Sequence, residues 1–97
     1  MSVRITCIKK DGGNHENPHI AITSCRWINE QTQASGESNR DIMYDWIVNK
    51  GGQAYVRDAQ GNTVYVYGAI SPSGRRYIRT ARDGVWTDNL LALPECA

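Results

Sequence analysis

Residues 51–80, GGQAYVRDAQGNTVYVYGAISPSGRRYIRT, decide the fold because runs of β-forming residues alternate in them with tight-turn sequences. Three strands are predicted, over residues 54–57, 63–70 and 76–80. The tetrapeptides DAQG and SPSG between them are typical of turns, where proline presets φ and glycine adopts a positive φ. Short turns join antiparallel neighbours, so this half predicts an antiparallel meander with its apolar middle strand at the centre.

The N-terminal part predicts a hairpin. Apolar and polar residues alternate over residues 3–7, turn-forming residues follow, and a second extended run covers residues 20–28. An antiparallel pairing of the two runs places residues of the same parity on one buried face. The predicted opposed pairs are Cys7 with Cys25 and Ile5 with Trp27.

A single helix is predicted over about residues 39–50, after a polar surface loop at residues 29–37. Ser38 is expected to cap its first turn, with Asp41 reaching back to the backbone. The apolar stripe at helical spacing consists of Ile42, Met43, Trp46 and Ile47. A helix this short is unstable alone in water, so Met43, Trp46 and Ile47 of the stripe have to pack on the sheet.

Beyond the meander the sequence predicts a brief strand at residues 85–86 and then an apolar tail, DNLLALPEC, at residues 88–96. The leucines of this tail are expected to pack on the core, because a small domain needs every large apolar side chain that it can bury. Asp88 or Asn89 is expected to anchor the tail, and Trp86 to cover the contact between the tail and the core.

These elements predict an α+β fold: a single small domain over residues 1–97, with the order β-β-α-β-β-β and one helix packed on a mainly antiparallel sheet. A formal net charge of +1 gives no general attraction to nucleic acid, and no apolar run is long enough to span a membrane. Three cysteines are an odd number, and the first residues lack the apolar stretch of a signal peptide. We therefore expect a cytoplasmic protein with reduced thiols.

Several short motifs also point to a known family. They are ITCI at residues 5–8, NPH at 17–19 with Ile22, YIRT at 77–80, the pair Asp83-Gly84 and DNLLALPEC at 88–96. With these motifs the chain resembles an uncharacterised bacterial and phage family, the domain of unknown function 3892, over most of its length. The family has no established activity. The resemblance therefore implies a small, soluble, stand-alone domain and assigns no catalytic residue.

A cluster of arginines and tyrosines is the first candidate site. The arginines, which fall in a stretch without acidic residues, are Arg75, Arg76, Arg79 and Arg82. Alternation places Tyr77 on the same strand face as Arg75 and Arg79. The neighbouring strand can align Tyr65 and Tyr67 with Tyr77. Guanidinium groups beside aromatic rings contact phosphates and stack on bases in sheet-based single-strand binders. The alternative is a solvated strand edge whose arginines cover the rings and deter edge pairing.

A second set of residues suits metal binding or catalysis. The four candidates are Cys7, His15, His19 and Cys25. Thiolate and imidazole are zinc ligands, although the spacing matches no standard zinc motif and buried cysteine is often a small hydrophobe. An imidazole at His19 could also activate a cysteine, or act as a general base beside Asp11 or Glu16.

From these patterns we interpret the chain as a non-catalytic binding module without a cofactor. Its expected working surface is the arginine–tyrosine face of the last strands, with the loop at residues 11–19 nearby. The sequence favours two kinds of partner equally: nucleic acid, or a protein, which could be a second copy of the chain. The alternative is a small enzyme or metal protein that uses Cys7, His19 and Cys25.

Overall fold

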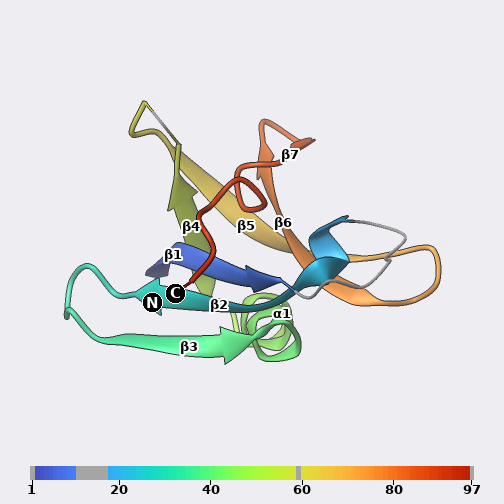
Figure 1. The fold of residues 1–97 in the computed structure, drawn as a ribbon, viewed down its shortest axis with the longest axis horizontal. Helices are drawn as coiled ribbons and strands as arrows, with labels where there is room; N and C mark the ends of the chain where they lie inside the picture. Colours follow the sequence, from blue (N-terminus) through green and yellow to red (C-terminus); the bar gives the residue numbers. More distant parts are fainter. Residues whose placement is uncertain (1, 11–17, 59, 97) are drawn as a thin grey trace.

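One seven-stranded sheet forms the framework of the chain (Figure 1). The structure, a computed structural model, describes residues 2–10, 18–58 and 60–96. Its elements are β1 (Ser2–Lys10), the short 3-10 helix η1 (Pro18–Ala21), β2 (Ile22–Ile28), β3 (Ser35–Asn39), α1 (Arg40–Asn49), β4 (Gln53–Arg57), β5 (Thr63–Ile70), β6 (Arg76–Arg82) and β7 (Val85–Thr87). The strand order is β3-β2-β1-β4-β5-β6-β7.

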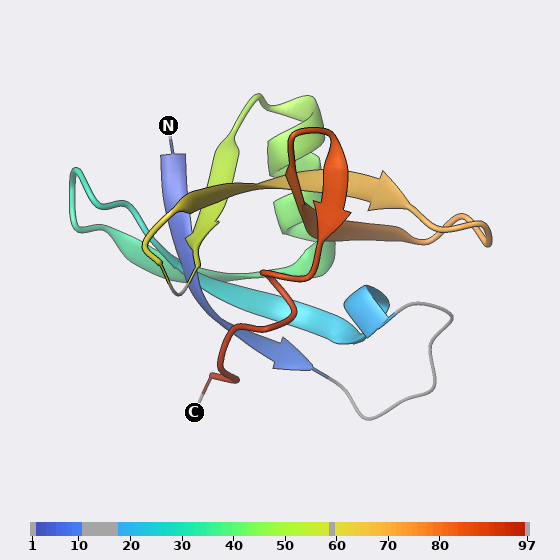
Figure 2. The ribbon, with the colours of Figure 1, turned by 90° about the horizontal axis from the view of Figure 1, so that it is seen from above.

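Neighbouring strands of the sheet run antiparallel, except that β1 and β4 run parallel. The chain between those two passes through β2, β3 and then α1, which packs against β5 and β6 (Figure 2). Gly68 permits this close approach, because a Cβ at that position would lie 2.4 Å from Val48. The part of the chain that the structure describes is thus a single small α+β domain with one α-helix on a mixed, mostly antiparallel sheet, which confirms the predicted fold class.

The N-terminal hairpin contains a bulge that the sequence pattern did not show. Ile5 lies opposite Trp27 as predicted, but Cys7 lies opposite Arg26 and Ile8 opposite Cys25, with a register shift at Thr6. A bulge adds one residue to one strand and so exchanges the faces of the residues that follow it. Ile8 is therefore buried in place of Cys7, and the predicted pairing of Cys7 with Cys25 is wrong by one residue.

The predicted loop before the helix ends in a strand. Residues 35–37, placed in that loop by their polarity, belong to β3, which pairs with the open edge of β2. Backbone pairing here overrides a low intrinsic preference for strand. The helix begins at Arg40, one residue after the predicted start, and its N-cap is Asn39, whose Oδ1 accepts from the N–H of Ile42 at 2.8 Å. Ser38 instead lies in β3 and accepts a hydrogen bond from the indole of Trp27 at 3.2 Å.

The predicted meander is present as β4, β5 and β6. The middle strand has the predicted bounds and lies between the other two. Gly61 and Gly74 have positive φ angles of 84° and 87°, as the two turns require. Asp83 and Gly84 both have positive φ as well, at 53° and 78°, and form a tight hairpin from β6 into β7.

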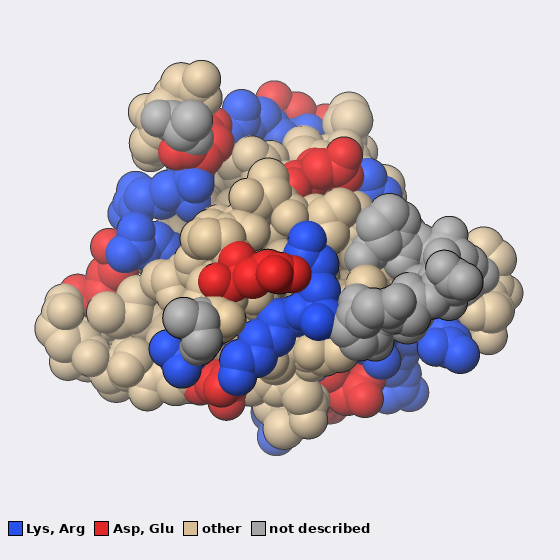
Figure 3. Space-filling view, in the orientation of Figure 1, with Lys and Arg blue, Asp and Glu red and all other residues tan. Residues whose placement is uncertain are grey.

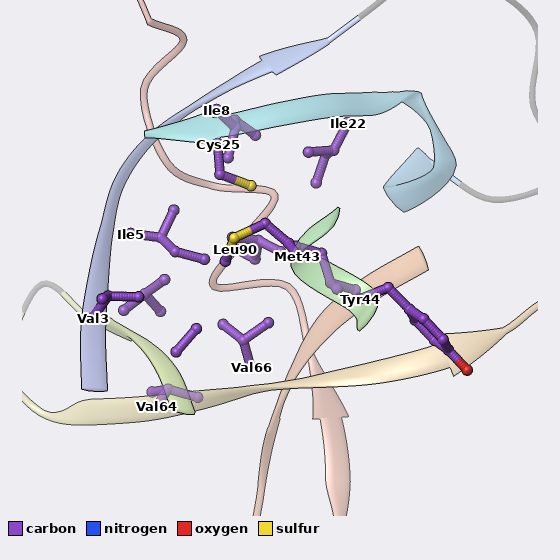
Figure 4. Packing of buried hydrophobic residues seen from close by; sticks show 13 residues of the cluster. Val3, Ile5, Ile8, Ile22, Cys25, Met43, Tyr44, Val64, Val66 and Leu90 are labelled. Carbon is purple, nitrogen blue, oxygen red and sulfur yellow. The ribbon is translucent and has the colours of Figure 1, made fainter. Parts of the chain in front are cut away.

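The core fills the concave side of the curled sheet and is closed by the tail (Figure 4). Leu90 is fully buried among side chains of β1, β4 and β5, and its N–H donates to Oγ1 of Thr80 at 3.3 Å. Leu91 and Leu93 are partly buried against the same cluster, which confirms that the tail packs on the core. Trp86 does not cover the contact between the tail and the core, because it points to the outer face of the sheet and is 46% exposed.

The last residues are joined to β1 by a disulfide bond between Cys7 and Cys96. Two backbone hydrogen bonds accompany it, from Ile8 N–H to the carbonyl of Pro94 at 3.1 Å and from Cys96 N–H to the carbonyl of Ile8 at 2.8 Å. The expectation of three reduced thiols is therefore wrong, because the bulge at Thr6 turns Cys7 toward the tail. The cytoplasmic location stays a prediction, although disulfides are more typical of oxidising compartments.

Cys25 keeps a free thiol inside the core. Burial, with a smaller contribution from the carboxylate of Glu37, raises its pKa to about 12. Within the described residues, the helices are too short or too polar to cross a membrane.

Candidate functional site

The outer face of strands β4 to β7, opposite the core residues Val64 and Val66, carries a row of aromatic side chains. The row consists of Tyr55, Tyr65 and Trp86, with Ala81 of β6 between the last two. Tyr67 lies on the same face, two residues along β5, and pairs with Arg79 of β6. Because successive side chains of a strand alternate between faces, the register alone brings these rings together. We call the surface formed by Tyr55, Tyr65, Tyr67 and Trp86 the aromatic face.

The rings of the aromatic face are open to solvent. Tyr65, Tyr67 and Trp86 are 45%, 49% and 46% exposed. Tyr55 meets Tyr65 edge to face, with ring centroids 6.4 Å apart. The small side chain of Ala81 leaves a shallow hollow of about 430 Å³ between the rings of Tyr67 and Trp86. Several large apolar surfaces therefore lie side by side without cover from the described part of the chain.

The arginines around the aromatic face are each held by a carboxylate. The ion pairs are Arg57 with Glu30 at 3.0 Å, Arg79 with Asp88 at 3.0 Å, and Arg82 with Asp58 at 2.9 Å. The hydrogen bond from Arg82 lowers the pKa of Asp58, and those from Tyr55 and then Arg57 lower the pKa of Glu30. On the side of the molecule seen in Figure 3, basic side chains likewise lie beside acidic ones. The face is aromatic and close to neutral.

Two arginines also lie over aromatic rings of this face. The guanidinium of Arg57 is 5.7 Å from the ring centroid of Tyr55, and that of Arg79 is 5.9 Å from the ring of Trp86. At these distances a cation is attracted to the face of an aromatic ring. The two contacts favour the ring orientations that the structure shows.

The structure divides the residues that the sequence grouped together. Tyr65 and Tyr67 lie on the aromatic face and Arg79 lies beside it, whereas Arg82 follows Ala81 on β6, where strand alternation points it to the opposite face. Tyr77 is buried, with its ring centroid 6.3 Å from that of His19 in η1. The remaining two members of the predicted surface lie apart from the face.

Those two members are Arg75 and Arg76. Arg75 precedes β6 and belongs to the turn, where its carbonyl accepts from the N–H of Ser71. Arg76 faces the helix side, with its guanidinium 5.6 Å from the ring of Tyr44. The arginine–tyrosine surface stays a prediction.

Sequence reasoning missed Tyr55, Arg57 and Trp86 as members of a surface. Alternation in the strand over residues 54–57 already puts Tyr55 and Arg57 on one face. The signal that would have found Trp86 is the Asp83-Gly84 turn, since a two-residue hairpin fixes Trp86 opposite Ala81.

His19 belongs to η1 and is buried against Tyr77. Its Nε2 is 3.6 Å from Oδ1 of Asp88, the carboxylate that also binds Arg79. Burial lowers the pKa of His19, and the nearby guanidinium of Arg79 lowers it further, while Asp88 opposes both. The net direction is downward because burial, the largest effect, disfavours the charged imidazolium.

The structure does not bring the candidate metal ligands together among the residues that it describes. Cys7 is bonded to Cys96, Cys25 is buried in the core, and His15 lies outside the residues that the structure describes. Among those residues, no group of three or more His, Cys, Asp or Glu side chains could hold a metal ion. A thiol with a pKa raised to about 12, as at Cys25, is also a weak nucleophile at neutral pH.

Comparison with protein families agrees with the motifs in the sequence. The model of the family described as "Protein of unknown function (DUF3892)" matches residues 4–94, nearly the whole chain. The chain belongs to this family. Neither the curated proteins nor the solved structures contain a significant match to it.

Proposed function

We propose that this DUF3892 domain is a non-catalytic binding module that contacts a protein partner through the aromatic face. The observation that carries the proposal is the side-by-side placement of Tyr65, Tyr67 and Trp86, each close to half exposed. Tyrosine, tryptophan and arginine are enriched at the energetic centres of protein interfaces. Contiguous exposed apolar surface of this kind is typical of interaction sites.

Charge favours a protein over nucleic acid as the partner. Affinity for nucleic acid comes largely from cations that neutralise phosphates. The guanidinium groups of Arg57, Arg79 and Arg82 are already paired with carboxylates of the same chain. Aromatic rings beside arginines that are already paired with carboxylates suit the mixed apolar and polar surface of a protein better than they suit the phosphates of nucleic acid.

The test compares three forms of the chain: the wild type, the double variant Tyr65→Ser/Trp86→Ser, and the control variant Ile70→Ser. Ile70 is 59% exposed and lies on the opposite face of β5, so the control removes apolar surface elsewhere. Each form is immobilised, and the sets of proteins that the three immobilised forms retain are compared by quantitative mass spectrometry. Retained proteins are then purified and titrated by calorimetry, and self-association is measured by sedimentation velocity.

If the proposal is correct, a purified protein or a second copy of the chain binds the wild type. Its affinity for the double variant should be at least about tenfold lower, and its affinity for the control should be unchanged. Circular dichroism and thermal unfolding verify that all three forms are folded. Labelled oligonucleotides, titrated at low and moderate salt, test the other class of partner. Salt-dependent oligonucleotide binding that needs the two rings would show that the partner is nucleic acid and not a protein. If no interaction depends on the two rings, the proposal is wrong.

A further inference from the structure

A second hollow, of about 440 Å³, lies between α1 and the strands β1, β2 and β3, and it shares no residue with the aromatic face. Small-molecule sites usually have volumes of about 300–1,000 Å³. Its apolar walls are formed by Val3, Trp27, Ile42, Met43 and Trp46. Val3 and Met43 are buried, while Ile42 at the rim is 56% exposed. The hollow is therefore apolar in depth and open at one side.

Both indole rings of this hollow are held in place by the glycine backbone behind them. A Cβ at Gly36 would lie 2.6 Å from the ring of Trp27, and a Cβ at Gly52 would lie 2.1 Å from the ring of Trp46. The N–H of the Trp27 indole also donates to Oγ of Ser38 at 3.2 Å. Walls that are already fixed lose little conformational entropy when a ligand binds.

The mouth of the hollow carries two carboxylates. Asp41 and Asp45 lie one turn apart on α1, and both line the hollow. Like charges at this spacing repel each other. Lys50 also lines the hollow, and its Nζ, 3.7 Å from Asp45, partly balances that carboxylate, which accepts a hydrogen bond from Asn49 at 2.8 Å. The carboxylate of Asp41 is 75% exposed and has Arg40 at 3.9 Å, so it remains open to a further cation.

We propose that this hollow binds a small organic cation: an aromatic or branched apolar body that carries one ammonium group. The body lies against Met43 and the two indoles, whose ring faces also attract a cation. The ammonium group lies between Asp41 and Asp45 and relieves their repulsion. The carboxylates disfavour anionic ligands of the same shape. This proposal concerns a different surface and does not depend on the protein-binding function proposed above.

The experiment is an NMR titration of the ¹⁵N-labelled full chain with phenethylamine. The chain has three tryptophans, so three indole N–H signals report on binding, and Trp86 on the aromatic face serves as the internal reference. We expect saturable shifts of the Trp27 and Trp46 signals and none of the Trp86 signal. The neutral 2-phenylethanol and the anionic 3-phenylpropionate, which have similar bodies, should bind at least about tenfold more weakly.

Charge-only variants complete the test. Asp41→Asn/Asp45→Asn should weaken phenethylamine binding about tenfold and leave 2-phenylethanol binding unchanged, while the turn variant Asp83→Asn should alter neither. If the double variant does not fold, Asp41→Asn alone is compared in the same way, since that side chain is exposed. Absence of saturable shifts at Trp27 and Trp46, or equal affinity for the amine and the alcohol, would overturn the proposal.

Discussion

At the scale of single residues, His19 links the stability of the chain to pH. It is 2% exposed, and burial together with Arg79 lowers its pKa from the usual 6.5. The unfolded chain binds a proton at a higher pH than the folded chain does, so acid favours unfolding. Stability contributed by neutral His19 should therefore be full above pH 6.5 and should fall as the pH drops below that value, by at most about 1.4 kcal/mol per pH unit.

Urea unfolding between pH 7.5 and about 5.5 measures this loss, because the carboxylates with lowered pKa values, such as Asp58 and Glu30, titrate below that range. The variant His19→Gln keeps a polar side chain that does not titrate. Its free energy of unfolding should be flatter over the same range. An equally steep loss in wild type and variant would show that His19 is not the group responsible.

The bulge at Thr6 explains why residue-level prediction failed at Cys7. Alternation over residues 3–7 correctly places Val3 and Ile5 in the core. One extra residue in β1 then exchanges the faces, so Ile8 takes the buried position and Cys7 faces the tail. Nothing in composition or spacing marks the site of such a bulge, because it depends on how two distant strands fit together.

At the scale of secondary-structure elements, the tail behaves as part of the core rather than as an appendage. Leu90 is fully buried, whereas Leu91 is partly buried. Leu90→Ala should lower the free energy of unfolding by about 2–5 kcal/mol, the cost of a large cavity in a packed core. Leu91→Ala, as the matched variant one residue away, should cost less. Urea denaturation of both variants decides the order, and a larger loss at Leu91 would mean that the tail packs differently.

Elements with a strong local signal were predicted well, and those that depend on a partner strand were not. β5 and α1 have clear turns, caps or apolar periodicity at their ends. β3 has the sequence SGESN, which favours a loop, and becomes a strand because the edge of β2 needs a partner. Asn39, the last residue of β3, caps the helix in place of Ser38, which lies within the strand.

At the scale of the whole molecule, the Cys7–Cys96 bond closes almost the entire chain into one loop. The two cysteines are separated by 89 residues in sequence. A cross-link over such a distance restricts the unfolded chain strongly, so breaking it should cost about 2–5 kcal/mol. Unfolding of the wild type with and without a reducing agent measures this difference. Cys7→Ser/Cys96→Ser should match the reduced wild type and should not respond to the reducing agent; a response would implicate another bond.

The candidate site could be predicted only in part because it is assembled by the sheet as a whole. Tyr65 and Tyr67 were predicted because their strand lies next to that of Tyr77, and both are exposed in the structure. Tyr77 has the same parity, but η1 covers it, and η1 belongs to a distant part of the chain. Likewise the carboxylate partner of Arg82 lies in the turn after β4. Charge balance of a surface is therefore a property of tertiary structure, which a local run of arginines does not reveal.

The pairing of Pro94 and Cys96 with Ile8 has a consequence for biosynthesis. The ribosome releases the first strand long before the residues that will cover it. Until residue 96 has emerged, β1 lacks the backbone partners that Pro94 and Cys96 provide, and the core around it lacks Leu90. The native state therefore forms only after residues 90–96 have left the ribosome and docked onto β1.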